Sequence, residues 1–143
     1  MFKGTFAVVP FAAVLLLGAS PSYAEITATI TDFHPTGTVY GTFNPGDTIG
    51  CSAAATCSAA PADHSFSLTV KIWDPYGYLV ASNEDRKQCN PSGTTNLSKS
   101  TNFTTPEILA PEYYFCEVIV KLIDQEGYPL QLAYDSGFVY CNY

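Results

Sequence analysis

The sequence lacks the residue patterns that mark most metal and catalytic sites. Its two histidines, His34 and His64, lie apart and beside turn residues, and neither a Cys-x2-Cys pair nor an Asp-x-Asp-x-Asp-Gly loop occurs. Those are the spacings with which proteins commonly hold zinc and calcium. No histidine stands in a recognisable catalytic pattern with a nucleophile and a carboxylate. We therefore expect a non-catalytic protein with no metal site and no cofactor.

Basic residues are scarce. The chain has 6 Lys and Arg residues against 13 Asp and Glu residues, a net charge of −7. Only Lys3 precedes Glu25, so a chain that began at Glu25 would carry five basic residues and a net charge of −8. Such a charge repels phosphate backbones and anionic lipids, which argues against nucleic acid or a membrane surface as a partner. Solubility is its simplest role.

Long apolar runs are also missing. The densest one, residues 11–17, is well short of the ~20 residues that a bilayer requires. It follows the charged Lys3 and precedes Ser22 and Ala24, two small residues at positions −3 and −1 of a cut before Glu25. This is the pattern of a cleaved signal peptide. We expect a signal peptide over residues 1–24 and one secreted, extracellular domain over residues 25–143.

All five cysteines lie in the predicted mature part, at Cys51, Cys57, Cys89, Cys116 and Cys141. A secreted chain passes through an oxidising compartment, so most of these cysteines should be paired. Because five is odd, one cysteine is left free or joins two chains in a homodimer.

Two sequons stand close together in the sequence. They are Asn96-Leu97-Ser98 and Asn102-Phe103-Thr104, and neither has proline in the middle. Asn96 and Asn102 are therefore candidates for glycosylation in a source that attaches glycans to asparagine, and such a segment would lie on the surface.

The rest of the chain is typical of β-strands. Thr, Val, Ile, Tyr and Phe are abundant, helical Ala-Leu-Glu-Lys runs are missing, and Gly and Pro recur at short intervals. We expect strands at residues 25–30, 65–73, 78–81 and 113–123, and a last strand over 130–141 with a bulge near Gly137. The small-residue segment 52–63 and the polar segment 82–100 predict loops.

One short pattern occurs twice, at a spacing of 50 residues. Residues 70–78 and 120–128 both read Val-Lys, two further residues of a strand, and then Asp-x-x-Gly-Tyr. An Asp at the start of such a turn bonds its own backbone, and a Gly at its end accepts a positive φ. The sequence therefore predicts two β-hairpins, with turns at Asp74–Gly77 and Asp124–Gly127.

Cys116 follows Cys51 by 65 residues and ends the triplet Tyr114-Phe115-Cys116. The spacing of these two cysteines resembles the immunoglobulin superfamily, in which strand B carries one cysteine and strand F carries Tyr-x-Cys. The resemblance implies a single all-β, immunoglobulin-like antiparallel sandwich, with the two hairpins in one sheet. The chain departs from the family at Ala110, where an Asp is usual, and at Trp73, which lies at a strand end. Residues 43–48 also look like the fibronectin-type and macroglobulin-type sandwich domains.

The resemblance implies a Cys51–Cys116 disulfide, while a local Cys51–Cys57 bond stays open as an alternative. A Cys116–Cys141 bond is disfavoured, because folding the second hairpin sets Cys116 opposite about Asp135. Cys141 then lies about 20 Å further along the strand, whereas a disulfide needs Cα atoms within about 7 Å.

Side-chain alternation predicts a candidate binding surface. If Phe66, Leu68, Val70 and Ile72 face the core, Trp73 points outward. The same alternation along residues 113–123 gives an outer patch that consists of Trp73, Lys71, Ile119, Lys121 and Ile123. Such a patch predicts a binding module for an extracellular protein or glycan. The alternatives are cover by the chain itself, a small secreted enzyme or inhibitor, and a self-assembling structural subunit.

We expect the secreted protein to begin at Glu25, because Ser22 and Ala24 supply the small residues that a signal peptidase selects. N-terminal sequencing of the secreted material checks this. A sequence that begins at Met1 would contradict it.

Overall fold

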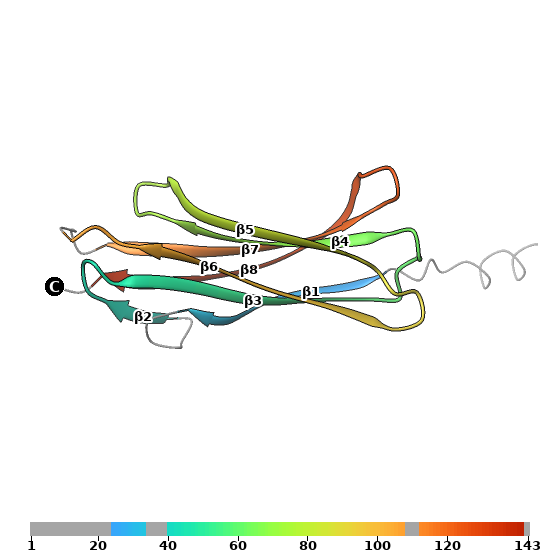
Figure 1. Ribbon diagram of the computed structural model, residues 1–143, viewed down its shortest axis with the longest axis horizontal. Coiled ribbons are helices and arrows are strands. Elements are labelled where there is room, and N and C mark those ends of the chain that lie inside the picture. The colour runs from blue at the N-terminus through green and yellow to red at the C-terminus, as the bar shows by residue number, and fades with distance from the viewer. Residues whose placement is uncertain (1–23, 34–39, 108–111, 142–143) are drawn as a thin grey trace, which may run out of the picture.

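The computed structural model describes residues 24–33, 40–107 and 112–141, which form a two-layer β-sandwich (Figure 1). The all-β prediction is confirmed. The eight strands are β1 (Glu25–Phe33), β2 (Tyr40–Phe43), β3 (Thr48–Ser58), β4 (Ser65–Trp73), β5 (Leu79–Gln88), β6 (Thr94–Thr104), β7 (Tyr113–Ile123) and β8 (Pro129–Cys141). No helix with the length and apolarity to span a membrane occurs in these residues. The predicted signal peptide lies almost wholly outside them.

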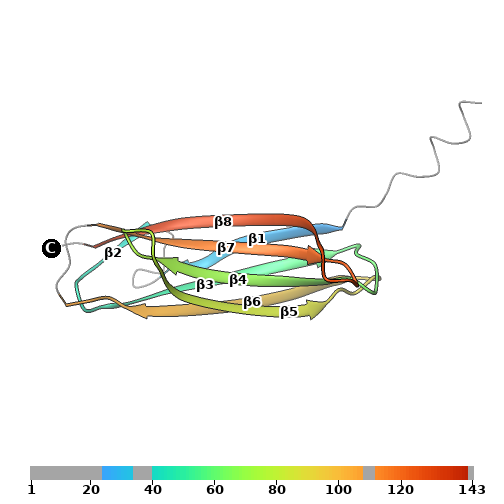
Figure 2. The ribbon, with the colours of Figure 1, turned by 90° about the horizontal axis from the view of Figure 1, so that it is seen from above.

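The strands form two sheets, whose strands run along the long axis of the molecule (Figure 2). The smaller sheet has the order β1-β3-β6, and the larger has the order β2-β8-β7-β4-β5. Neighbouring strands pair antiparallel except for β2, which runs parallel to β8. β3 and β7 are the middle strands of their sheets, so each is hydrogen-bonded on both sides.

The core lies between the sheets and follows the predicted alternation. In β4 the buried side chains include Phe66, Leu68 and Ile72, all without solvent exposure. The facing strand β3 contributes the small Ala53 and Ala55, each 1% exposed. Large side chains from one sheet therefore pack against small ones from the other, which fills the interior without overpacking.

One disulfide crosses this core. Cys51 of β3 is bonded to Cys116 of β7, with a Cα–Cα distance of 6.4 Å, as the resemblance implied. The local alternative, Cys51–Cys57, is wrong because both residues lie in β3. Six residues along an extended strand span about 20 Å, which is far beyond the reach of a disulfide.

Hydrogen bonds and ion pairs also hold the two lateral sides of the sandwich. On one side the Ile30 backbone N–H of β1 donates to Asp135 Oδ2 of β8, at 2.7 Å. On the other side Asn83 Nδ2 of β5 donates to the Ser100 carbonyl of β6, at 2.9 Å. Lys99 Nζ of β6 lies 3.5 Å from Asp85 Oδ2 of β5. Each of these contacts joins one sheet to the other.

Both predicted hairpins are confirmed. In the β4–β5 turn, Asp74 Oδ1 accepts hydrogen bonds from the backbone N–H groups of Tyr76 and Tyr78, and Gly77 has a φ of 85°. In the β7–β8 turn, Asp124 Oδ1 accepts from the Tyr128 N–H, and Gly127 has a φ of 95°. Both hairpins lie in the larger sheet, as the resemblance implied.

The predicted loops are wrong over most of their length. Residues 52–58 continue β3, and much of residues 82–100 belongs to β5 and β6. The small residues of β3 are poor strand formers by themselves, but pairing with β1 and β6 on both sides outweighs that preference. β5 is polar because it is an edge strand whose side chains largely face solvent.

The predicted bulge near Gly137 is also wrong. β8 runs without interruption from Pro129 to Cys141, and Gly137 pairs regularly with Cys116. The register shift of this hairpin lies instead between Leu122 and Ile123, next to the turn. The hairpin register therefore differs by two residues from the predicted one, in which Cys116 faces Asp135.

Removing the disulfide should strongly destabilise the fold. The bond closes a sequence separation of 65 residues, so the double variant Cys51→Ala/Cys116→Ala should lose about 4 kcal/mol of unfolding free energy in the chain-entropy model. Urea unfolding measures the difference. The control is Cys141→Ala, which removes a buried cysteine that is in no disulfide. A double variant no less stable than this control would contradict the expectation.

Candidate functional site

A row of apolar side chains crosses the outer face of the larger sheet near the β4–β5 turn. The strand register sets Leu79 of β5, Trp73 of β4, Phe115 of β7 and Phe138 of β8 side by side. Phe115 lies on the outer face because its two neighbours in β7, Tyr114 and Cys116, are buried in the core. Four different strands therefore contribute to one continuous surface.

Two tyrosines extend this row toward the end of β8. Tyr113 lies opposite Tyr140, with their ring centroids 4.8 Å apart, and the rings of Phe115 and Phe138 are 5.0 Å apart. Tyr113 also packs edge-on against Phe138, at 6.2 Å. We call Trp73, Tyr113, Phe115, Phe138 and Tyr140 the aromatic face. Tyr113 is 59% exposed and Phe138 is 43% exposed, so much of this surface is open to solvent.

Polar contacts fix Trp73, the single tryptophan of the chain. Its indole Nε1 donates a hydrogen bond to Glu117 Oε2, at 3.1 Å. Lys71 Nζ lies 5.6 Å from the indole ring centroid and 3.8 Å from the same Glu117 oxygen. The ammonium group therefore meets the electron-rich ring face and a carboxylate together. These contacts hold the ring in one orientation on the outer face.

A shallow hollow adjoins the indole ring. It has a volume of about 340 Å³ and is lined by Trp73, Asp74, Pro75, Gly77, Phe115 and Glu117. Its lining combines apolar side chains with the two acidic residues Asp74 and Glu117. Such a surface suits an apolar side chain with a cationic or hydrogen-bonding neighbour.

The sequence-predicted site residues are spread along this face. Trp73 and Lys71 lie in the cluster just described, and the register places Ile119 opposite Thr69 and Lys121 opposite Ser67, further along the sheet. Ile123 is 8% exposed and lies outside the main core cluster, at the far end of β7. The structure thus brings together two of the five residues and adds Glu117 to them. Their role in binding stays a prediction.

Sequence reasoning missed most of the aromatic face. Tyr113 and Phe115 share the alternation of Glu117 and Ile119, so the same parity argument could have found them. Phe138 and Tyr140 lie beyond the bulge expected near Gly137, and a bulge interrupts the alternation that assigns side chains to a face. The observed strand has no bulge there, and its register sets Phe138 opposite Phe115.

Between β4 and β5, charged side chains cover the outer face. Thr69 Oγ1 donates to Glu84 Oε2 at 3.1 Å, and Arg86 Nε donates to Ser65 Oγ at 2.7 Å. Thr69 and Ser65 are each 6% exposed. On β4 and β5 the open apolar surface is therefore confined to the end that carries the β4–β5 turn, whereas on β8 the exposed Leu130, Leu132 and Tyr134 continue toward the β7–β8 turn.

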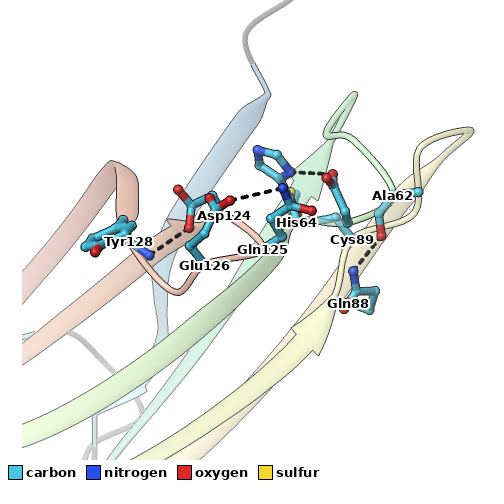
Figure 3. Close-up of polar contacts among 10 residues, drawn as sticks. Ala62, His64, Gln88, Cys89, Asp124, Gln125, Glu126 and Tyr128 are labelled. Atoms are coloured by element: carbon cyan, nitrogen blue, oxygen red, sulfur yellow. Dashed lines mark hydrogen bonds and ion pairs between the residues drawn. The ribbon is translucent and has the colours of Figure 1, made fainter.

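The histidine region at the other end has structural contacts (Figure 3). His64 Nδ1 and Asp63 Oδ1 are 2.8 Å apart, and this hydrogen bond lowers the pKa of the Asp63 carboxyl. In the same view Gln88 Nε2 donates to the Ala62 carbonyl, and Asp124 caps its turn at Tyr128. No group of three or more metal-binding side chains occurs in the part of the chain that the structure describes. His34 lies outside that part.

The outer face of the smaller sheet has a different character. Its hydroxyl groups pair across strands, with Thr27 Oγ1 and Thr56 Oγ1 at 2.6 Å. The two sequon residues, Asn96 and Asn102, are exposed and lie on this outer face of β6, because their neighbours Thr95, Leu97 and Thr101 are buried. The glycosylation candidates and the aromatic face are therefore on opposite sides of the molecule.

No protein-family model and no curated protein sequence matches the chain. Among solved structures, a β-glucuronidase from glycoside hydrolase family 2 is 14% identical with a TM-score of 0.48, over 78% of this chain and 11% of that chain. A family 2 member from Bacteroides cellulosilyticus is 13% identical with a TM-score of 0.49, over 80% of this chain and 16% of that one. A family 123 glycoside hydrolase from Clostridium perfringens is 11% identical with a TM-score of 0.45, over 84% and 27%.

The chain thus spans a small part of each of these enzymes. Likenesses at this level carry no argument about activity or ligand.

The placement of Trp73 predicts a small effect of its removal on stability. Trp73→Ala loses one hydrogen bond and some surface packing, so it should cost about 1 kcal/mol of unfolding free energy. Phe66→Ala, the matched change on the core face of the same strand, should cost about 3–5 kcal/mol. Chemical denaturation of both variants gives the two values. Equal losses would show that Trp73 is part of the core.

Proposed function

We propose that the domain is a secreted, non-catalytic binding module that holds a protein partner on its aromatic face. The observation that carries the proposal is the row in which the half-buried Trp73 and Phe115 lie beside the exposed Phe138 and Tyr113. The signal-peptide pattern and the Cys51–Cys116 bond support an extracellular location.

Clustered exposed aromatic residues are typical of binding surfaces. Tyrosine and tryptophan are enriched among the residues that dominate binding energy at protein interfaces, because they bury a large area with few rotatable bonds. Here the aromatic rings come from strands of a hydrogen-bonded sheet rather than from loops, so the surface is rigid before binding. A rigid surface loses little conformational entropy when a partner docks.

Ring orientation favours a protein partner over a glycan. The planes of Tyr113 and Tyr140 meet at 48°, those of Phe115 and Phe138 at 45°, and those of Tyr113 and Phe138 at 84°. A flat platform on which successive sugar rings stack needs ring faces that lie side by side in one plane, and these three pairs do not offer one. Tilted and edge-on rings instead form an uneven apolar surface that suits protein side chains.

Charge around the aromatic face indicates the kind of partner. Asp74 and Glu117 line the hollow, and Glu112 directly precedes Tyr113 and acts electrostatically on Tyr114. Lys71 is the nearby cation, and Glu117 pairs with it at 3.8 Å. The surround is therefore acidic. We infer a partner with apolar side chains flanked by Lys or Arg, which complementary charge would steer and orient.

Self-assembly through β5 is the less favoured function. Glu84, Asp85, Arg86 and Lys87 follow one another along this edge strand. A row of charges blocks edge-to-edge pairing with a second sheet, because the partner strand would have to desolvate them. The chain therefore protects this edge and leaves its aromatic face open.

We further propose that the sandwich is of the immunoglobulin type, with β3 and β7 in the places of strands B and F. Tyr114, two residues before Cys116, is 2% exposed and packs against Phe43 and Phe103 at 5.5 and 5.9 Å. Burial raises the pKa of its phenol. The domain departs from the family at Trp73, which lies on the outer face instead of in the core.

A crosslinking experiment tests the binding proposal. The photoreactive residue p-benzoylphenylalanine is placed at position 138 of the purified domain, and at position 128 as the control, and each protein is irradiated in the extracellular fluid of the source organism. Tyr128 is a matched control because it is 68% exposed but lies at the other hairpin turn. We expect a protein crosslinked from position 138 and absent from position 128.

The binding constant of that protein, once identified and purified, completes the test. Trp73→Ala and Phe138→Ala should each weaken binding by roughly 30-fold, equivalent to about 2 kcal/mol for a central aromatic anchor. Tyr128→Ala should leave the affinity unchanged, and higher salt should slow association. Equal affinities for all four proteins would contradict the proposal, as would specific binding to immobilised polysaccharides without any protein partner.

A further inference from the structure

Two cysteines outside the known disulfide lie in direct contact. The Sγ atoms of Cys57 and Cys89 are 3.1 Å apart, although the residues are 32 positions apart in the sequence. Both are buried, with exposures of 0% and 4%. They belong to different parts of the fold: Cys57 is on the core face of β3, and Cys89 directly follows β5.

Hydrogen bonds that do not involve sulfur hold the chain around Cys89. Its backbone N–H donates to the His64 carbonyl at 2.9 Å. The side chain of the preceding residue, Gln88, donates through Nε2 to the Ala62 carbonyl (Figure 3). The next residue, Asn90, donates its N–H to Thr95 Oγ1 at 2.9 Å. Independent contacts thus fix Cys89 before any covalent link forms.

The same contacts place Cys89 beside Cys57. Thr95, which binds the Asn90 N–H, is the residue of β6 directly opposite Cys57 in the β3–β6 register. Cys57 itself is held in the middle strand of its sheet, paired with Ile26 on the other side. The short distance between the two sulfurs therefore follows from the backbone positions of Cys57 and Cys89 and not only from the rotamers of their side chains.

We propose that the secreted protein carries a second disulfide, Cys57–Cys89, that joins the end of β3 to the end of β5. It would be another covalent link between the two sheets, about 20 Å from Cys51 along β3. Four of the five cysteines are then paired. Cys141 is left as the single thiol, and it is buried at the end of β8.

Cys141 is too remote to compete for either sulfur. It pairs with Phe43, just before the start of β3, whereas Cys57 lies nine residues after the first residue of β3. Nine residues of extended strand span about 30 Å. The register of the sheets therefore leaves Cys57 and Cys89 as each other's partner.

The bond forms by thiol–disulfide exchange with a disulfide oxidant of the secretory compartment, such as an oxidised dithiol enzyme or oxidised glutathione. The two S–H bonds of Cys57 and Cys89 break and one S–S bond forms between them. Two electrons and two protons pass to the oxidant, whose own S–S bond becomes two thiols. The thiolate of one cysteine attacks the oxidant first, and the second cysteine then resolves the mixed disulfide.

The timing follows from burial. Removal from water raises the pKa of Cys89 to about 12, and the hydrogen bond with Cys57 adds to the shift. The attacking thiolate is therefore scarce in the folded, reduced protein at neutral pH. Oxidation should take place during folding, while both cysteines are still accessible to the oxidant.

A tryptic map of the secreted wild-type protein without reduction tests the proposal. Free thiols are first alkylated in denaturant. Trypsin then separates the peptide that ends at Lys71, with Cys51 and Cys57, from peptides 88–99, 100–121 and 122–143, which carry one remaining cysteine each. We expect the first three to stay linked together. Peptide 122–143 should be released with an alkylated Cys141.

Two outcomes would overturn the proposal. One is release of peptide 88–99 with an alkylated Cys89, and the other is its linkage to peptide 122–143. Because Cys51 and Cys57 share a peptide, the variant Cys57→Ser assigns the bond. It should release peptide 88–99 while the Cys51–Cys116 link remains, and retention of peptide 88–99 would contradict the assignment. The control is reduction before digestion, which should release all four peptides. The map does not depend on any binding partner.

Discussion

The Cys51–Cys116 bond joins the middle strand of one sheet to the middle strand of the other, and the rest of the sandwich is arranged around it. The β3 side of the interior consists largely of alanine and cysteine, which bury little apolar surface for each residue. Hydrophobic burial alone is therefore modest on that side. The disulfide offsets this weakness because it lowers the conformational entropy of the unfolded chain. Hydrogen bonds between the sheets, such as that from the Ile30 N–H to Asp135, stabilise the sides of the sandwich.

The scaffold and the candidate site are connected through the β4–β5 turn. Asp74 caps this turn and directly follows Trp73, so the hydrogen bonds that define the hairpin also fix where the indole stands. The strand pairing then aligns Phe115 and Phe138 beside it. Towards the opposite end, Glu84 and Arg86 cover the same sheet face. The aromatic face is open only where no long charged side chain lies across it.

The sequence predicted features that depend on the chemistry of neighbouring residues. It did not predict features that depend on which strands pair with one another. Asp74 and Gly77 predicted their turn because few residue types suit each of these positions, and strict alternation predicted the inward face of β4. The strand residues Ala53 and Ala55 looked like a loop because their conformation comes from two neighbouring strands rather than from their own preference. Phe138 was missed because the bulge expected near Gly137 left the face of the residues after it undecided, whereas the observed strand runs without interruption.

Lys71, Trp73 and Glu117 show why the aromatic face suits recognition better than simple cover of the core. A lone exposed tryptophan would sample several orientations and lose that freedom on binding, at a cost of roughly 0.5–1.5 kcal/mol for an immobilised side chain. Here the hydrogen bond to Glu117 and the ammonium group of Lys71 over the ring restrict it beforehand. Trp73 lies outside the core cluster. A side chain that only shielded the core would not need these polar contacts. A ring that is held still on an open surface is already in the state that a partner requires.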